Sequence, residues 1–139
     1  MTQTQQPVEP RTSMLSPGVT AAFGFVVYAL SMIAGNVFEW NMDSRLDNAH
    51  PHTVWESVTD FAAEYAIGLV GVAIAVWAGR QAWRGQPSRL ALTALILAVV
   101  AAVTIPAFWA GWSNVFGAVA VGLALEHRRR VGSLRNCRK

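Results

Sequence analysis

Three carboxylates spaced four residues apart are the residues of this sequence best suited to chemistry. Glu56, Asp60 and Glu64 stand at i, i+4 and i+8, so on a helix they share one face. Continuing that face along the chain gives a stripe of small residues, namely Gly68, Gly71, Ala75 and Gly79. Within a membrane, small residues mark the line along which another helix packs closely. We therefore expect the carboxylates to point toward a neighbouring helix.

Polar residues of two other apolar segments fall at the same level as these carboxylates. The predicted cation, proton or substrate site comprises Glu64, Asp60, Glu39, Asn36 and Asn114. A carboxylate at the centre of a membrane helix costs about 2.5–3.5 kcal/mol, so it is protonated, paired or bound to a cation. The structural alternative is that Glu64 hydrogen-bonds Tyr28 or Asn114 and only locks the helices together.

A metal site is a second candidate, in the polar segment before the carboxylates. His50 and His52 are followed by Glu56, and imidazole and carboxylate groups are ligands for Zn or Cu. The alternative is a solvated loop with Asp, Asn and His-Pro turns. We identify no catalytic residue and expect no cofactor, because the single cysteine, Cys137, has no partner for a thiol site and no histidine lies within an apolar run.

Charge-free runs define the elements that must position these groups. The chain has 139 residues, of which 53% are hydrophobic and 14% charged, against roughly 25% charged in soluble domains. One charge-free run covers 18–38, and another of 36 residues covers 90–125, which is about 54 Å as a helix and fits two crossings better than one. The sequence predicts an all-α membrane protein, a four-transmembrane-helix bundle with helices near 18–39, 58–80, 89–108 and 112–127.

The basic residues predict the orientation. Three arginines lie between the second and third helices and six basic residues follow the fourth, whereas six of the eight acids fall in or beside the outer loop 40–57. The positive-inside bias then places both termini in the cytoplasm. Residues 1–17 are expected to form a disordered cytoplasmic tail, and 128–139 a basic cytoplasmic tail in which Arg128, Arg129 and Arg130 contact anionic lipid.

The source and the partners follow from composition alone. Arginine outnumbers lysine ten to one, which is typical of GC-rich bacterial genomes, so we expect a multi-pass protein of a bacterial plasma membrane. The expected partners are the lipid bilayer and either a second copy of the chain or a larger membrane complex. The basic charge reflects membrane orientation, so we expect no nucleic acid.

Three functions remain open at this point. The first is binding or assembly, as an accessory membrane subunit. The second is a small transporter or channel subunit with an acidic cation or proton site in the outer half of the bundle. The third is a membrane enzyme acting on lipid or quinone, which no nucleophile or cofactor site supports, so the sequence favours a protein that is not an enzyme.

Overall fold

The chain forms helices throughout the part that the computed structural model describes, residues 15–47 and 53–136. Side chains are described for 15–38, 53–107 and 109–132. The elements, in chain order, are α1 (Pro17–Asp47), α2 (Val54–Asp60), α3 (Ala62–Trp83), α4 (Pro87–Val103), the 3₁₀ helix η1 (Ile105–Ala110) and α5 (Trp112–Asn136). No strand occurs within those two stretches, so the predicted all-helical class is confirmed.

Two of the helices are long and apolar enough to cross a membrane. They are the part of α1 from Pro17 to Phe38 and the whole of α3, each 22 residues long, which is about 33 Å of helix against a hydrocarbon core of ~30 Å. Helix α4 is apolar but shorter, at 17 residues. Helix α5 has 25 residues, and its second half carries most of its charge, beginning at Glu126.

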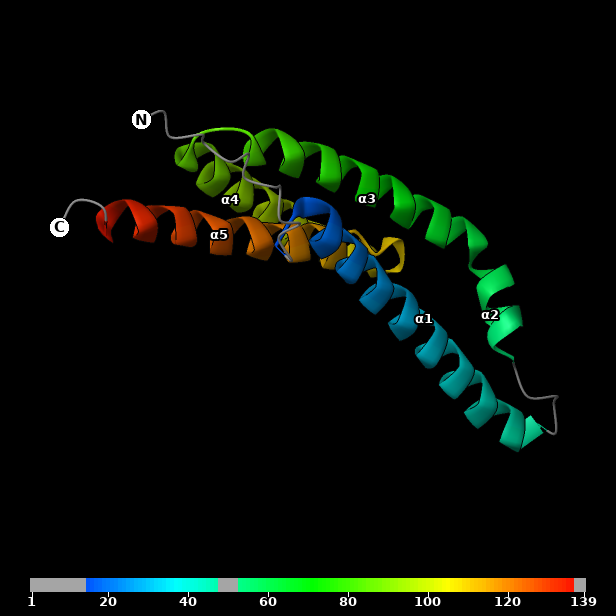
Figure 1. Cartoon of the computed structure of the whole chain (residues 1–139). Helices are drawn as coiled ribbons and strands as arrows, with labels where there is room; N and C mark the ends of the chain where they lie inside the picture. Colours follow the sequence, from blue (N-terminus) through cyan, green and yellow to red (C-terminus); the bar gives the residue numbers. More distant parts are fainter. Residues whose placement is uncertain (1–14, 48–52, 137–139) are drawn as a thin grey trace, which may run out of the picture.

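The long helices run up and down against one another (Figure 1). At one end, Gly79 of α3 lies against Pro17 of α1, and His127 of α5 contacts Pro87 of α4. At the other end, Tyr28 of α1 reaches the η1 helix that joins α4 to α5. Helices α1 and α4 therefore run in one direction and α3 and α5 in the other, with α5 packed against α1, α3 and α4.

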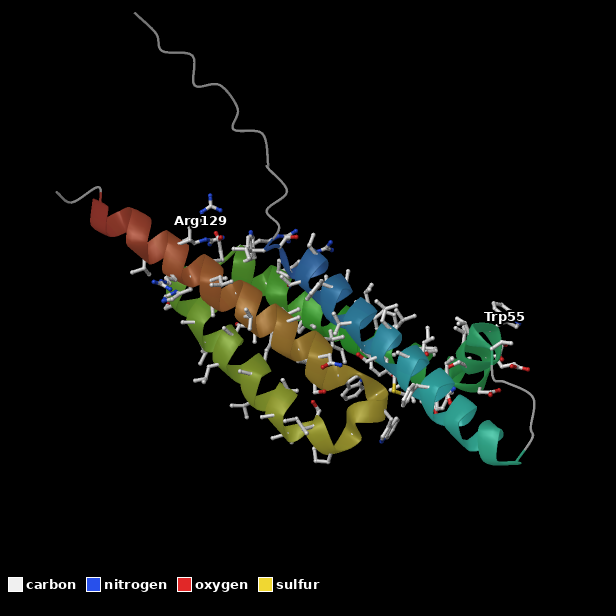
Figure 2. The ribbon with its side chains drawn as sticks, turned by 90° about the horizontal axis from the view of Figure 1, so that it is seen from below. Trp55 and Arg129 are labelled. Carbon is white, nitrogen blue, oxygen red and sulfur yellow. The ribbon has the colours of Figure 1, made fainter. Side chains whose placement is uncertain are left out.

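The packed interior is narrow and rich in small and branched residues. Its members include Ala21, Ala75, Leu90, Val115, Val119 and Leu123. Large apolar side chains project outward from every long helix, as the sticks of Figure 2 show. Phe23 on α1, Trp77 on α3 and Leu95 on α4 are each more than half exposed. An outer surface this apolar is suited to contact with lipid rather than with water.

Close approach between helices depends on glycine. A Cβ at Gly71 of α3 would lie 2.6 Å from the Trp112 ring, and one at Gly24 of α1 would lie 2.7 Å from the backbone oxygen of Asn114. Gly68, Gly71, Ala75 and Gly79 are all buried, which confirms that the predicted small-residue stripe is a packing face. The residues that fill it belong to this same chain.

The helix boundaries differ from the sequence prediction at several points. Helix α1 continues to Asp47, and α2 occupies part of the expected loop 40–57. A break at Phe61, with φ −104° and ψ 22°, separates α2 from α3, where we expected one helix from 58 to 80. The basic segment from Arg128 continues α5 as far as Asn136. Most of the expected N-terminal tail, residues 1–14, lies outside the described residues.

Candidate functional site

The break at Phe61 separates the three carboxylates that the sequence placed on one helix face. Glu56 and Asp60 belong to α2 and are exposed, whereas Glu64 belongs to the first turn of α3 and is half-buried. The break turns the axis of α2 away from that of α3 (Figure 1). Of the three carboxylates, Glu64 is therefore the one inserted between helices.

Glu64 lies beside two tyrosines, and we call Glu64, Tyr65 and Tyr28 the acid–tyrosine cluster. The rings of Tyr28 and Tyr65 meet edge to face, with their centroids 6.0 Å apart. Glu64 and Tyr65 are consecutive residues in the first turn of α3. The cluster thus joins the start of α3 to the middle of α1.

Two buried polar atoms of this cluster have no hydrogen-bond partner, and they are Glu64 Oε2 and the Tyr65 hydroxyl. Leaving a buried donor or acceptor unpaired costs about 1–3 kcal/mol. Unpaired groups are rare in folded proteins, and each calls for an explanation such as a proton, water or ion. A carboxylate and a phenol hydroxyl can together coordinate a cation or share a proton.

The turn between η1 and α5 fixes the third member of the cluster. Tyr28 is only 1% exposed, and its hydroxyl donates a hydrogen bond to the Trp109 carbonyl oxygen. Gly111, with φ +68°, brings the backbone directly against the Tyr28 ring, where a Cβ would lie 2.5 Å from a ring carbon. Trp112 donates from Nε1 to the Ile67 carbonyl oxygen at 2.9 Å, which ties the turn to α3 one helical turn below Glu64.

The other predicted site residues are placed elsewhere. The Asn36 amide donates to Ser57 Oγ at 2.8 Å, joining α1 to α2. The Asn114 side chain is exposed, because α5 turns Val115 and Phe116 into the core instead. Glu39 lies in α1, but its side chain is outside the described residues. Of the five predicted site residues, Glu64 is the one that the described side chains place between the long helices, in the same region as Tyr28 and Tyr65.

The predicted metal ligands are divided between described and undescribed residues. His50 and His52 lie outside the described residues. Glu56 forms a capping box at the start of α2, in which its Oε2 accepts from the Thr53 backbone N–H at 2.8 Å. Across 15–47 and 53–136, no group of three or more His, Cys, Asp or Glu residues could hold a metal ion.

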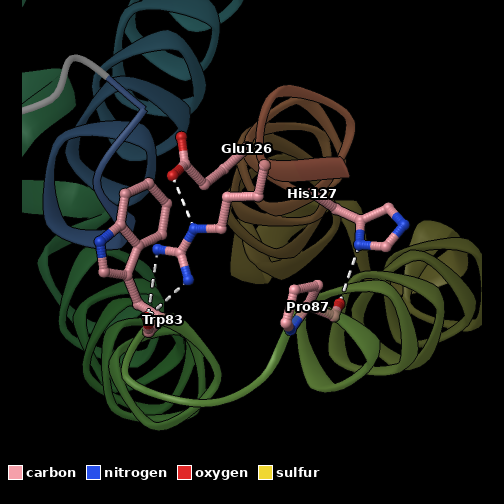
Figure 3. A network of polar contacts seen from close by, with 5 residues as sticks. Trp83, Pro87, Glu126 and His127 are labelled. Atoms are coloured by element: carbon pink, nitrogen blue, oxygen red, sulfur yellow. Dashed lines mark hydrogen bonds and ion pairs between the residues drawn. The ribbon is translucent and has the colours of Figure 1, made fainter. Parts of the chain in front are cut away.

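The opposite end of the molecule carries a second polar network, drawn in Figure 3. Arg130 Nε donates to Glu126 Oε1 at 2.8 Å, and its terminal nitrogens both donate to the Trp83 carbonyl oxygen at 3.2 Å. The guanidinium also stacks over the Trp83 ring, 5.3 Å from its centroid. His127 Nδ1 lies 2.8 Å from the Pro87 carbonyl oxygen.

This network changes the interpretation of the three consecutive arginines. Arg130 is turned inward and fastens α5 to the end of α3. Arg128 and Arg129 are exposed, and Figure 2 shows Arg129 at the end of the molecule opposite Trp55 of α2. Of the three arginines predicted to contact anionic lipid, Arg128 and Arg129 are therefore the two with exposed side chains, and the lipid contact itself stays a prediction.

Sequence reasoning missed Tyr65, whose buried hydroxyl, like Glu64 Oε2, has no hydrogen-bond partner. Adjacent residues on a helix do not share a face, so face spacing gave no signal for the pair. Both residues lie in the first turn of α3, directly after the break at Phe61. The high aromatic content around the break was the one available hint.

No protein-family model matches the chain, and no curated protein and no solved structure matches it significantly. The function must therefore be argued from the acid–tyrosine cluster, the surface and the distribution of charge.

Proposed function

We propose that the chain is an integral membrane protein in which α1, α3, α4 and α5 each cross the bilayer, with both termini in the cytoplasm. The exposed apolar side chains on all four helices support this arrangement. So does the separation of charge, because Arg80 and Arg84 lie at the end of α3 away from α2, which carries Glu56 and Asp60. Arg129 likewise lies at the end of the molecule opposite α2. Positive charge collects on the cytoplasmic side of membrane proteins. A bacterial plasma membrane remains the prediction from composition.

Helix α4 and the apolar part of α5 are short for a membrane crossing, but both can span the bilayer with a modest adjustment. Helix α4 is about 26 Å long at ~1.5 Å per residue, and η1 extends it toward the outer surface. The apolar part of α5, from Trp112 to Leu125, is about 21 Å, and its arginines can reach outward along their aliphatic stems. Local thinning of the bilayer costs only a fraction of a kcal/mol per Å.

Within that framework, we propose that the acid–tyrosine cluster binds a proton or a small cation, as part of a small transporter or channel subunit. The observation that carries the proposal is the buried and unpartnered Glu64 Oε2 beside the unpartnered Tyr65 hydroxyl. An ionisable group inside a membrane is by default a candidate functional site. No lysine, arginine or histidine occurs between residues 53 and 79 to neutralise the carboxylate from its own helix.

The test is ion flux through vesicles that contain the purified full chain. Wild-type protein, Glu64→Gln and Asp60→Asn would be reconstituted at equal density, and proton and monovalent cation flux followed with entrapped dyes. We expect Glu64→Gln to abolish flux, while Asp60→Asn, an exposed carboxylate in α2, retains it. Equal flux through Glu64→Gln and wild type would refute the proposal.

Assembly with another membrane subunit is the second candidate, and one observation favours it. The small-residue face of α3 is already filled from within the chain, so a partner needs a different surface. A groove of about 430 Å³ between α1 and α5 offers one, with Val19, Phe23, Gly117 and Gly122 in its lining. If assembly is the function, Gly117→Leu should dissociate an oligomer seen in cross-linking, and Glu64→Gln should leave it intact.

A further inference from the structure

A second groove, on α3, combines an apolar strip with unpaired positive charge. It has a volume of about 490 Å³, and the described residues that line it all belong to α3, between Leu69 and Arg84. They repeat every three or four residues, so they form one continuous face of the helix. This face differs from the one that packs Gly71, Ala75 and Gly79 against the other helices, and it looks outward.

The two ends of this groove differ in chemistry. Its apolar part includes Val72 and Val76, which rest on the core, and Trp77, which is 66% exposed. Its polar part is formed by Arg80, Gln81 and Arg84. Tryptophan beside arginine at the end of an apolar helix is typical of the boundary between acyl chains and headgroups.

The two arginines of the groove are free to bind an anion. The guanidinium groups of Arg80 and Arg84 have no hydrogen bond or ion pair with the residues that the structure describes, in contrast to that of Arg130. They stand at i and i+4, so their Cβ atoms are about 5–6 Å apart on the same side of the helix. Guanidinium groups bind phosphate oxygens in a planar, two-pronged geometry, and no acidic residue lines the groove among those described.

The length of the groove fits one leaflet. Leu69 and Arg80 are 11 residues apart, which is about 16 Å of helix. Half of a ~30 Å hydrocarbon core is ~15 Å. With Arg80 at the headgroup level, the apolar strip therefore reaches the middle of the bilayer, the depth of a single phospholipid acyl chain.

We propose that this groove binds one anionic phospholipid of the cytoplasmic leaflet. Its phosphate lies between Arg80 and Arg84, with Gln81 as a further donor, and one acyl chain lies along the strip from Leu69 to Trp77. The continuous apolar strip favours a lipid over a free phosphate, because a free phosphate has no apolar part to bury against the strip. This inference rests on the membrane topology proposed above, because that topology puts the arginines at the cytoplasmic surface.

The experiment is a lipid titration of the full chain in detergent micelles, read by thermal unfolding. Short-chain phosphatidylglycerol, short-chain phosphatidylcholine and glycerol 3-phosphate would each be added to wild-type protein and to R80Q/R84Q. The control, Arg89→Gln, removes another exposed arginine, which does not line the groove. Ala73→Trp blocks the apolar strip without changing charge.

We expect phosphatidylglycerol to stabilise the wild type and to bind R80Q/R84Q about thirtyfold more weakly. This factor follows because each basic residue near the membrane surface contributes about 1 kcal/mol, and about 1.4 kcal/mol corresponds to a tenfold change in affinity. Ala73→Trp should also weaken it, and Arg89→Gln should stay close to wild type. Equal stabilisation by phosphatidylcholine, equal binding of glycerol 3-phosphate, an unaffected R80Q/R84Q or an equal loss in Arg89→Gln would each overturn the proposal. If R80Q/R84Q does not fold, the effect of Ala73→Trp decides.

A separate measurement distinguishes failure of the lipid-site proposal from failure of the proposed membrane topology. Membranes that contain the protein would be washed with alkaline carbonate, which releases proteins that do not span the bilayer. Release of the chain would refute the topology and this inference with it. Retention together with no preference for phosphatidylglycerol would refute the lipid site alone.

Discussion

Gly111→Ala is the substitution for which the structure gives the most definite expectation. Gly111 has φ +68°, in the left-handed region that L residues adopt at a cost of about 1–2 kcal/mol. Its added Cβ would lie 2.5, 2.6 and 2.7 Å from three carbon atoms of the Tyr28 ring. Tyr28 is 1% exposed and is bonded through its hydroxyl to the Trp109 carbonyl, so its ring cannot move aside without losing that bond.

The expected cost follows from these contacts. Inserting a methyl group into a well-packed site costs about 1–3 kcal/mol. Alanine also lowers the conformational entropy of the unfolded chain relative to glycine, which stabilises the folded protein by about 0.4–1 kcal/mol. The net expectation for Gly111→Ala is a loss of about 1–5 kcal/mol in the free energy of unfolding.

The matched control is Gly117→Ala. A Cβ there meets only the Ala101 Cβ, at 3.9 Å, which is ordinary contact, and Gly117 is in the interior of α5. Alanine in a helix interior is favoured over glycine by about 0.5–1 kcal/mol. Both variants would be compared with wild type by equilibrium unfolding of the purified chain in detergent. If Gly111→Ala is as stable as Gly117→Ala, the described packing of the turn against Tyr28 is wrong.

Five further substitutions test the two polar regions in the same unfolding assay. Tyr65→Phe removes a buried hydroxyl without a partner, so without added ligand it should stabilise by about 1–3 kcal/mol; Tyr28→Phe removes a bonded one and should destabilise by about 1 kcal/mol. A reversed order would show that Tyr65 is bonded. Trp112→Phe loses its bond to the backbone of α3 and should cost about 0.5–1.5 kcal/mol; no loss would contradict that bond. Arg130→Met leaves the carboxylate of Glu126, which is 8% exposed, without its ion-pair partner and should cost about 1–3 kcal/mol. Glu126→Gln should cost less, because the amide oxygen still accepts a hydrogen bond from Arg130.

The helices and one packing face could be predicted from the sequence because they depend on local pattern. The charge-free run 18–38 predicted the apolar part of α1, and the spacing of Gly71, Ala75 and Gly79 predicted which side of α3 is buried. Both signals come from residues a few positions apart on one helix. Neither depends on how distant parts of the chain meet.

The site could be predicted only in part because it depends on tertiary placement. Glu64 was expected between helices and is half-buried, but the placement of Tyr65 and Tyr28 around it depends on the break at Phe61 and on the turn at Gly111. A break in a helix between Asp60 and Ala62 has no glycine or proline to announce it. The rotation of α5 that exposes Asn114 is set by its contacts with three other helices.

The central claim is that Glu64 is a ligand-binding carboxylate, and thermal stability of the purified full chain tests it most directly. Wild type, Glu64→Gln and Asp60→Asn would be unfolded across a range of pH and with a panel of monovalent, divalent and organic cations. A cation at 100 times its dissociation constant stabilises by about 2.7 kcal/mol. The account predicts a pH- or cation-dependent shift in wild type and Asp60→Asn that is lost in Glu64→Gln. The same shift in all three proteins, or no shift in any, would contradict it.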